Sequence, residues 1–300
     1  MKKLALAGLM AATLTGCSSQ EEPQVLNLYN WSEYMPQEVL DRFEEETGIQ
    51  VVYTTYDSNE AMYARLKLLD DSGQYDLALP STYYVNKMRE EGLLEKINHE
   101  KLEGFEKLDP ELTNLDIDPE NQYSVPYLWG TTGLAYDAND VEGEEVTAWS
   151  DLWDEKYEGR VMLTNDMREV FHIGLRVLGY SGNSTDPEEI EAAYDKLTEL
   201  MPAVRTFNSD APRMPYLEGE TDIGMIWNGE AVMGEEDMPS LEYVYPEEGI
   251  IVWLDSFVIP KNAKNADAAH QFISFVMRPE ISALISEDIG YATPNLAARE

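Results

Sequence analysis

The sequence has few of the residues on which many enzyme and metal sites depend. It contains one cysteine, Cys17, so a disulfide within the chain is excluded. The three histidines, His99, His172 and His270, lie too far apart in the sequence to form a metal-ligand motif. Phosphate-loop patterns of the forms GxxxxGK and GxGxxG and the zinc pattern HExxH are also absent. We therefore expect no catalytic residue, no cofactor and no metal.

Positive charge is scarce as well. The 300 residues include 21 Lys and Arg against 58 Asp and Glu, which gives a formal net charge of −37 at pH 7. Nucleic acid is excluded as a default partner, because phosphate backbones attract basic surfaces. Most single carboxylates are expected to be solvated surface groups that keep the protein soluble. The same negative field would concentrate a cationic ligand.

The N-terminal apolar run is too short to span a bilayer, which needs about 20 residues. This run, Leu4 to Leu14, follows a basic start and is typical of a signal peptide. It ends in LTGC, which resembles the signal of bacterial lipoproteins. The resemblance implies a signal peptide at residues 1–16, a lipid on Cys17, and a tether through residue 24. The alternative is a chance cysteine after an ordinary signal peptide. We expect a periplasmic protein held at a membrane only by its lipid.

Strand and helix patterns alternate along the rest of the chain. The first region predicts three strands and three helices in turn: VLNLYN, PQEVLDRFEEET, IQVVYTTY, SNEAMYARLKLLD, YDLALPS and YYVNKMREEG. This order is typical of a parallel sheet with helical crossovers. A second alternating region begins at REVFHIGLRVLGYS and ends at NADAAHQFISFVMRPE. Two α/β regions behind an export signal predict a two-lobed binding protein that closes around its ligand.

Aromatic, acidic and hydroxyl residues gather at the predicted strand and helix ends. Ligands of parallel sheets bind at the carboxyl ends of the strands. A flexible organic cation needs carboxylates and hydroxyls at its amines, and aromatic walls along its methylenes. Candidates for these roles are Trp31, Ser32, Glu33, Tyr34, Ser81, Tyr83, Asp166, Glu169, Trp227, Trp253 and Asp255.

Most of these candidates also fit a purely structural role. Trp31 and Tyr34, taken alone, are more typical of core or lobe-interface aromatics. Asp166 and Glu169 stand at a predicted helix start, where they would complement the helix dipole. Asp255 differs, because it lies inside the apolar strand GIIVWLDSFVIP with no basic neighbour. A buried Asp needs a partner, so a ligand cation is a good candidate.

At these residues the chain resembles the periplasmic polyamine-binding proteins of spermidine/putrescine ABC transporters, most of all the spermidine-preferring branch. The likeness runs from Val25 to Arg299 and rests on YNWSEY, ETGI, YDSNEAMYA, LPSTYYV, VPYLWG, REVF, LGYSGN, MIWNG and GYATPNLAAR. It implies a type II-like periplasmic-binding-protein fold with a hinge of crossover strands and the ligand in the interlobe cleft. We expect one lobe at 25–131 plus 254–300 and the other at 132–253. Family chains continue beyond NLAAR with a Gln that contacts the ligand, so the second lobe is expected to lack a C-terminal part.

The resemblance also implies residue roles. The aromatic walls would be Trp31, Tyr34, Trp227, Trp253 and Tyr291. The acidic partners would be Glu33, Asp166, Glu169 and Asp255, and the hydroxyl contacts would be Ser32, Ser81, Tyr83 and Ser209. Tyr83 favours spermidine over putrescine, because the putrescine-preferring branch tends to carry an acidic residue there. The expected role is polyamine capture for an ABC permease.

Two other functions stay open. A ferric-ion or other cation receptor of the same fold would use the adjacent pair Tyr83 and Tyr84. An extracellular hydrolase would use paired carboxylates such as Asp166 and Glu169.

Overall fold

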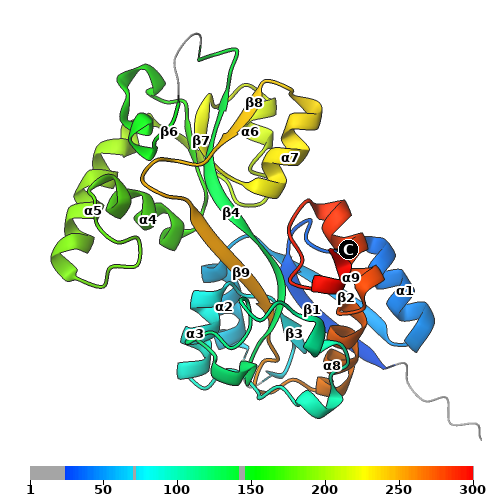
Figure 1. Ribbon diagram of the computed structural model, residues 1–300. Coiled ribbons are helices and arrows are strands. Elements are labelled where there is room, and N and C mark those ends of the chain that lie inside the picture. Colours follow the sequence, from blue (N-terminus) through cyan, green and yellow to red (C-terminus); the bar gives the residue numbers. More distant parts are fainter. Residues whose placement is uncertain (1–23, 70–71, 142–145, 300) are drawn as a thin grey trace, which may run out of the picture.

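The computed structural model describes residues 24–69, 72–141 and 146–299. The predicted signal peptide, Cys17 and all but the last residue of the predicted tether lie outside these ranges. Figure 1 shows two bodies, each with a sheet and helices, joined by long strands. Within the described ranges, none of the helices is both long and apolar enough to cross a membrane.

The first lobe is built on a parallel sheet with strand order β2-β1-β3. Its strands are β1 (Val25–Trp31), β2 (Gln50–Tyr56) and β3 (Leu77–Ala78). Its helices are α1 (Gln37–Thr47), α2 (Asn59–Leu68), α3 (Thr82–Glu90), α8 (Ala266–Val276) and α9 (Pro279–Ile289).

Local sequence signals explain the helix ends that frame the site. The α1 helix buries Val39, Leu40 and Phe43 on one face and stops at Gly48, whose φ of 73° favours glycine. The α2 helix begins after Ser58, whose hydroxyl accepts a hydrogen bond from the Ala61 backbone amide. Both helices are therefore positioned by the chain's own caps and apolar stripes.

The second lobe has a mixed sheet with strand order β6-β5-β7-β4-β8. Its strands are β4 (Val125–Asp137), β5 (Val161–Leu163), β6 (Val204–Phe207), β7 (Ile223–Trp227) and β8 (Leu241–Val244). The β5 strand is parallel to β6 and β7, whereas β4 is antiparallel to β7 and β8. The helices are α4 (Met167–Val177), α5 (Pro187–Leu200), α6 (Met214–Leu217) and α7 (Asn228–Asp237).

Short 3₁₀ turns complete the connections. They are His99–Lys101, Phe105–Lys107, Pro119–Asn121, Trp149–Trp153, Glu155–Tyr157, Met201–Ala203 and Leu296–Ala298.

Two antiparallel strands run between the lobes. The β9 strand (Ile251–Phe257) pairs with β4 from Val125 opposite Phe257 to Thr132 opposite Ile251. At Gly130 a Cβ atom would lie 2.5 Å from the Trp253 ring, so glycine lets that indole lie across β4. These strands are the only long connection visible between the two described bodies in Figure 1.

Each lobe has its own hydrophobic core. In the first, Phe43 packs against Phe272 and Phe275 from α8. In the second, buried Trp149 and Leu163 belong to a separate cluster. Two α/β cores joined by crossover strands confirm the two-lobed fold that the sequence predicts.

Candidate functional site

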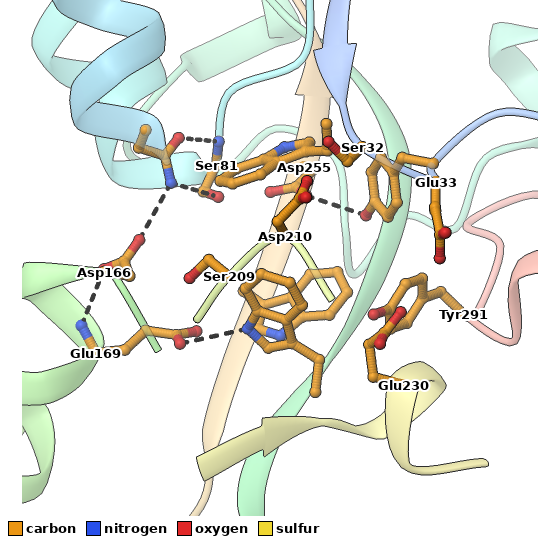
Figure 2. A pocket seen from close by; sticks show the side chains of 15 residues that line it. Ser32, Glu33, Ser81, Asp166, Glu169, Ser209, Asp210, Glu230, Asp255 and Tyr291 are labelled. Carbon is orange, nitrogen blue, oxygen red and sulfur yellow. Dashed lines mark hydrogen bonds between the residues drawn. The ribbon is translucent and has the colours of Figure 1, made fainter. Parts of the chain in front are cut away.

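A pocket with an empty volume of about 530 Å³ lies between the two lobes. The pocket is lined by Trp31, Ser32, Glu33, Tyr34, Asn59, Ser81, Asp166, Glu169, Ser209, Asp210, Trp227, Glu230, Trp253, Asp255 and Tyr291. The structure thus brings together every predicted site residue except Tyr83 (Figure 2). They come from β1, β7, β9, the start of α4, and the segments that follow β1, β3, β6 and α9.

Aromatic rings from both lobes form the apolar walls. The Trp31 indole donates a hydrogen bond to the Leu79 carbonyl at 2.9 Å, which fixes the ring at the end of β1. Its ring meets Trp227 edge-on, with 6.2 Å between centroids. Tyr291 lies edge-on to both Tyr34 and Trp253, at 5.6 Å and 5.1 Å. These aromatic rings therefore pack against one another and also line the pocket.

Asp255 is the carboxylate in the middle of the pocket. It is 5% exposed, and its Oδ2 accepts a hydrogen bond from the Tyr34 hydroxyl at 3.0 Å. Its Oδ1 is buried and has no hydrogen-bond partner among the described residues. Burial raises the pKa of Asp255 to about 7, against the opposing effect of the Ser81 and Tyr34 hydroxyls. An added cation at Oδ1 would relieve this unfavourable desolvation.

Asp166 connects the two lobes at one end of the pocket. Its Oδ1 accepts from the Glu169 backbone amide at 3.0 Å and caps α4, as the helix-dipole interpretation predicts. Its Oδ2 accepts hydrogen bonds from the Tyr83 hydroxyl and from Asn59 Nδ2, both in the first lobe. Tyr83 thus lies behind the pocket wall and acts on it through Asp166.

Glu169 is a second buried carboxylate beside Asp166. Its Oε1 accepts from the Thr132 hydroxyl at 2.6 Å, and its Oε2 accepts from the Thr164 hydroxyl at 3.2 Å and the Trp227 indole at 3.4 Å. Burial, with the negative charge of Asp166 next to it, raises the pKa of Glu169. Two carboxylates at one end form a place where a cation would be stabilised.

Hydroxyl groups on the pocket wall are held by neighbouring polar groups. The Ser81 hydroxyl accepts from Asn59 Nδ2 at 3.0 Å, and Asn59 Oδ1 accepts from the Ser81 amide at 3.1 Å. The Ser209 hydroxyl accepts from the Asn165 amide at 2.8 Å. Each of these hydroxyls can still donate a hydrogen bond to a ligand.

Sequence reasoning missed three of the lining residues: Asn59, Asp210 and Glu230. Asn59 opens α2, and Glu230 lies in the first turn of α7. The signal that could have found them is the one used for Asp166, a polar residue at a helix start. Asp210 follows the predicted contact Ser209 directly in the sequence.

The lobes touch each other around the pocket. Besides the Tyr83–Asp166 bond, Arg213 of the second lobe donates to Glu33 of the first at 3.1 Å. The two lobes are therefore in direct contact at both ends of the pocket.

The described residues give no support to a metal centre. No group of three or more His, Cys, Asp and Glu side chains among them is arranged to hold a metal ion. Of the pair Tyr83 and Tyr84, Tyr84 is buried against Tyr63 and Tyr83 and does not line the pocket.

Two α/β lobes closed over an acidic, aromatic pocket define a solute-binding protein of the transport class. The chain belongs to the bacterial extracellular solute-binding protein family, whose sequence model matches residues 38–300, and within it to the spermidine/putrescine-binding periplasmic proteins. This family consists of substrate-binding transport proteins, so the chain is not an enzyme.

Three comparisons illustrate the relationship. The spermidine/putrescine-binding periplasmic protein of Escherichia coli is 50% identical over 299 residues, which cover 100% of this chain and 85% of that protein. The putrescine-binding periplasmic protein PotF of Escherichia coli is 33% identical, with coverage of 99% and 86%. The solved structure of the Tp0655 (TpPotD) lipoprotein of Treponema pallidum is 31% identical, covers 92% of this chain and 88% of that one, and has a TM-score of 0.82.

Proposed function

We propose that the protein captures a polyamine outside the cytoplasm, spermidine in preference to putrescine, and delivers it to the permease of an ABC transporter. The observation that carries the proposal is Asp255. It is a buried carboxylate among aromatic rings, and one of its oxygens has no partner among the described residues. A protonated amine of the ligand supplies both the missing hydrogen bond and the missing positive charge.

The remaining carboxylates fit an extended cation. Figure 2 shows Asp166 and Glu169 at one end of the pocket, Glu33 and Glu230 at the other, and Asp255 between them. A linear polyamine would place ammonium groups at these positions and methylenes along the Trp and Tyr rings. Closure of the lobes would remove the ligand from water and present one closed form to the permease.

Spermidine is favoured over putrescine because three acidic positions match three amines better than two. The higher identity to the spermidine/putrescine-binding relative than to the putrescine-binding one, 50% against 33%, supports this preference. Tyr83 supports it as well, because its hydroxyl orients Asp166 rather than adding a further negative charge.

The ferric-ion alternative is weaker. Adjacent tyrosines would have to reach the same ion, but Tyr84 packs against Tyr63 and Tyr83 on the core side of α3. Burial also raises the pKa of Tyr84 to about 12, which opposes the tyrosinate form that binds ferric ion.

We also propose the cellular setting and the lobe boundaries. Cys17 carries a lipid after cleavage of residues 1–16, and residues 17–24 form a tether to the membrane. The name of the Treponema pallidum relative, a lipoprotein, supports this proposal. We assign residues 25–131 plus 254–300 to the first lobe and residues 132–253 to the second.

The test is calorimetric titration of the protein from Ser18 onward with spermidine, putrescine and a neutral sugar at two salt concentrations. We expect saturable one-to-one binding of spermidine that persists at high salt, weaker binding of putrescine, and none of the sugar. Binding that disappears with added salt would refute the proposal, because it would show only general attraction of cations to the acidic surface.

A further inference from the structure

Arg213 places a fixed positive charge at one end of the pocket. Its Nη1 donates to both carboxylate oxygens of Glu230, at 2.8 Å and 2.7 Å. Its Nη2 donates to Oε2 of Glu33 at 3.1 Å. One guanidinium therefore holds a carboxylate from each lobe, and both of these carboxylates line the pocket.

The three side chains of this arrangement differ in burial. Arg213 has a side-chain exposure of 18% and Glu230 of 6%, whereas Glu33 retains 58%. The bidentate pair with Glu230 is thus desolvated and geometrically fixed, while Glu33 stays partly open to water. Burial raises the pKa of Glu230, and the attraction of Arg213 opposes that effect.

The two ends of the pocket consequently differ in charge. Asp166, Glu169 and Asp255 have no ion pair with Lys or Arg within the described part of the chain. Glu33 and Glu230, at the opposite end in Figure 2, share one Arg. The pocket is therefore strongly acidic at one end and in the middle, and partly neutralised at the other end.

We propose that Arg213 is a specificity-determining residue that limits the number of ammonium groups the pocket accepts. This inference rests on the proposed polyamine function and extends it. A tri-amine fills the three acidic positions and ends at Glu33. A longer tetra-amine would push its last ammonium past Glu33 toward the guanidinium of Arg213, which repels it. Repulsion between nearby like charges is an effective way to reject a wrong partner. The site thereby favours tri-amines over tetra-amines.

The test compares a tri-amine and a tetra-amine, spermidine and spermine, by calorimetric titration of wild type and an Arg213→Gln/Glu230→Gln variant. The double change avoids leaving Glu230 buried without its Arg213 partner, keeps the net charge, and frees Glu33. We expect the ratio of the spermine Kd to the spermidine Kd to fall by at least about tenfold. The matched control is Arg205→Gln, at an exposed Arg of β6 outside the pocket lining, which should leave the ratio unchanged.

A second variant tests the role of Arg213 by a change that should raise, rather than lower, the ratio of the spermine Kd to the spermidine Kd. Glu33→Gln leaves the Arg213–Glu230 pair in place and removes the half-exposed carboxylate that offsets it, so the ratio should rise. Glu33→Gln still tests the role of Arg213 if the double variant does not fold.

The outcomes separate the two proposals. Suppose that wild type binds spermidine but the Kd ratio changes by less than about twofold in the pocket variants. This result would overturn the role of Arg213 and leave the proposed function standing. An equal fall of the ratio in Arg205→Gln would also overturn the role of Arg213, since the effect would then not depend on where the arginine was removed. Wild type that binds neither polyamine would overturn the proposed function itself.

Discussion

At the scale of single residues, the pocket carries carboxylates that are unfavourable without a ligand. Asp255 and Glu169 are both buried, and burial raises the pKa of each. A group whose pKa is higher in the folded state favours folding while it is protonated, and this contribution is lost as the pH rises through its folded pKa. The ligand-free protein therefore gives up stability at these residues, and a bound cation restores it.

Asp255→Asn is expected to weaken spermidine binding by about 100-fold, because a buried charge pair is lost. The same substitution should raise the melting temperature of the ligand-free protein at pH 8. The pKa of Asp255 is about 7 in the folded protein and about 3.9 in an unfolded chain. Wild type should thus lose stability, on the order of a few kcal/mol, between about pH 4 and pH 7. Titration calorimetry and thermal melts at several pH values measure both effects.

The control is Asp195→Asn, at an exposed position of α5, which should change neither affinity nor the pH profile of stability. Unaltered spermidine affinity in Asp255→Asn would contradict the central place given to this carboxylate. A variant less stable than wild type at pH 8 would contradict the claim that the ionised group is unfavourable without a ligand.

At the scale of secondary-structure elements, closure depends on a close approach between α7 and the segment after α9. A Cβ atom at Gly229 would lie 2.5 Å from the Tyr291 ring. Gly290, at φ 79°, is the αL cap of α9, and a Cβ atom there would lie 3.4 Å from Gly229 Cα. Glycine at position 229 thus lets the second lobe meet the Tyr291 wall of the first.

Gly229→Ala is expected to weaken spermidine binding by roughly 10- to 100-fold, which corresponds to an overpacking penalty of about 1–3 kcal/mol. The added methyl group opposes the closed form, so each lobe should still fold. Titration calorimetry gives the affinity and circular dichroism the fold.

Gly48→Ala is the matched control for this substitution. Its φ of 73° makes alanine strained, but a Cβ atom there would have no neighbour within 4 Å. This variant should lose stability and keep its affinity. Equal affinity losses in both variants would show that general destabilisation, rather than blocked closure, is the cause.

Most elements of the first lobe were predictable because their signals are local, but α9 was not predicted. The α1 helix shows an apolar stripe and a glycine stop, and β1, β2 and α2 also lie where the sequence predicts them. The β3 strand is shorter than predicted, only Leu77–Ala78. The short elements β5, β8 and α6 were missed, because three or four residues carry too little periodicity to identify.

The candidate site shows the same division between local and long-range information. Trp31 and Asp255 follow from strand ends and from a charge within an apolar strand. Glu230 and its partner Arg213 were not predicted, because their role depends on Glu33, 180 residues from Arg213 in the sequence. The packing of the two lobes decides which helix starts of one lobe face the other. Patterns in a single sequence do not contain this information.

At the scale of the whole molecule, the net charge of −37 acts beyond the pocket. A strongly negative surface raises the rate at which a cation arrives, and salt screens this long-range attraction. In the proposed complex, contacts at the buried carboxylates Asp255 and Glu169 would be shielded from salt and would hold the ligand once the lobes close. The association and dissociation rate constants of the ligand should therefore respond differently to ionic strength.

We expect the association rate constant for spermidine to fall by about tenfold or more as the ionic strength rises from about 0.01 M to about 0.15 M, over which the Debye length shrinks from about 30 Å to about 8 Å. The dissociation rate constant should change much less, because the ligand leaves a desolvated pocket. Stopped-flow measurements of the tryptophan fluorescence would follow both, since Trp31, Trp227 and Trp253 line the pocket. Asp255→Asn provides the control: it should dissociate faster while its association rate keeps the same salt dependence. A salt dependence confined to dissociation would mean that the surface charge does not steer the ligand and that the acidic composition has another cause.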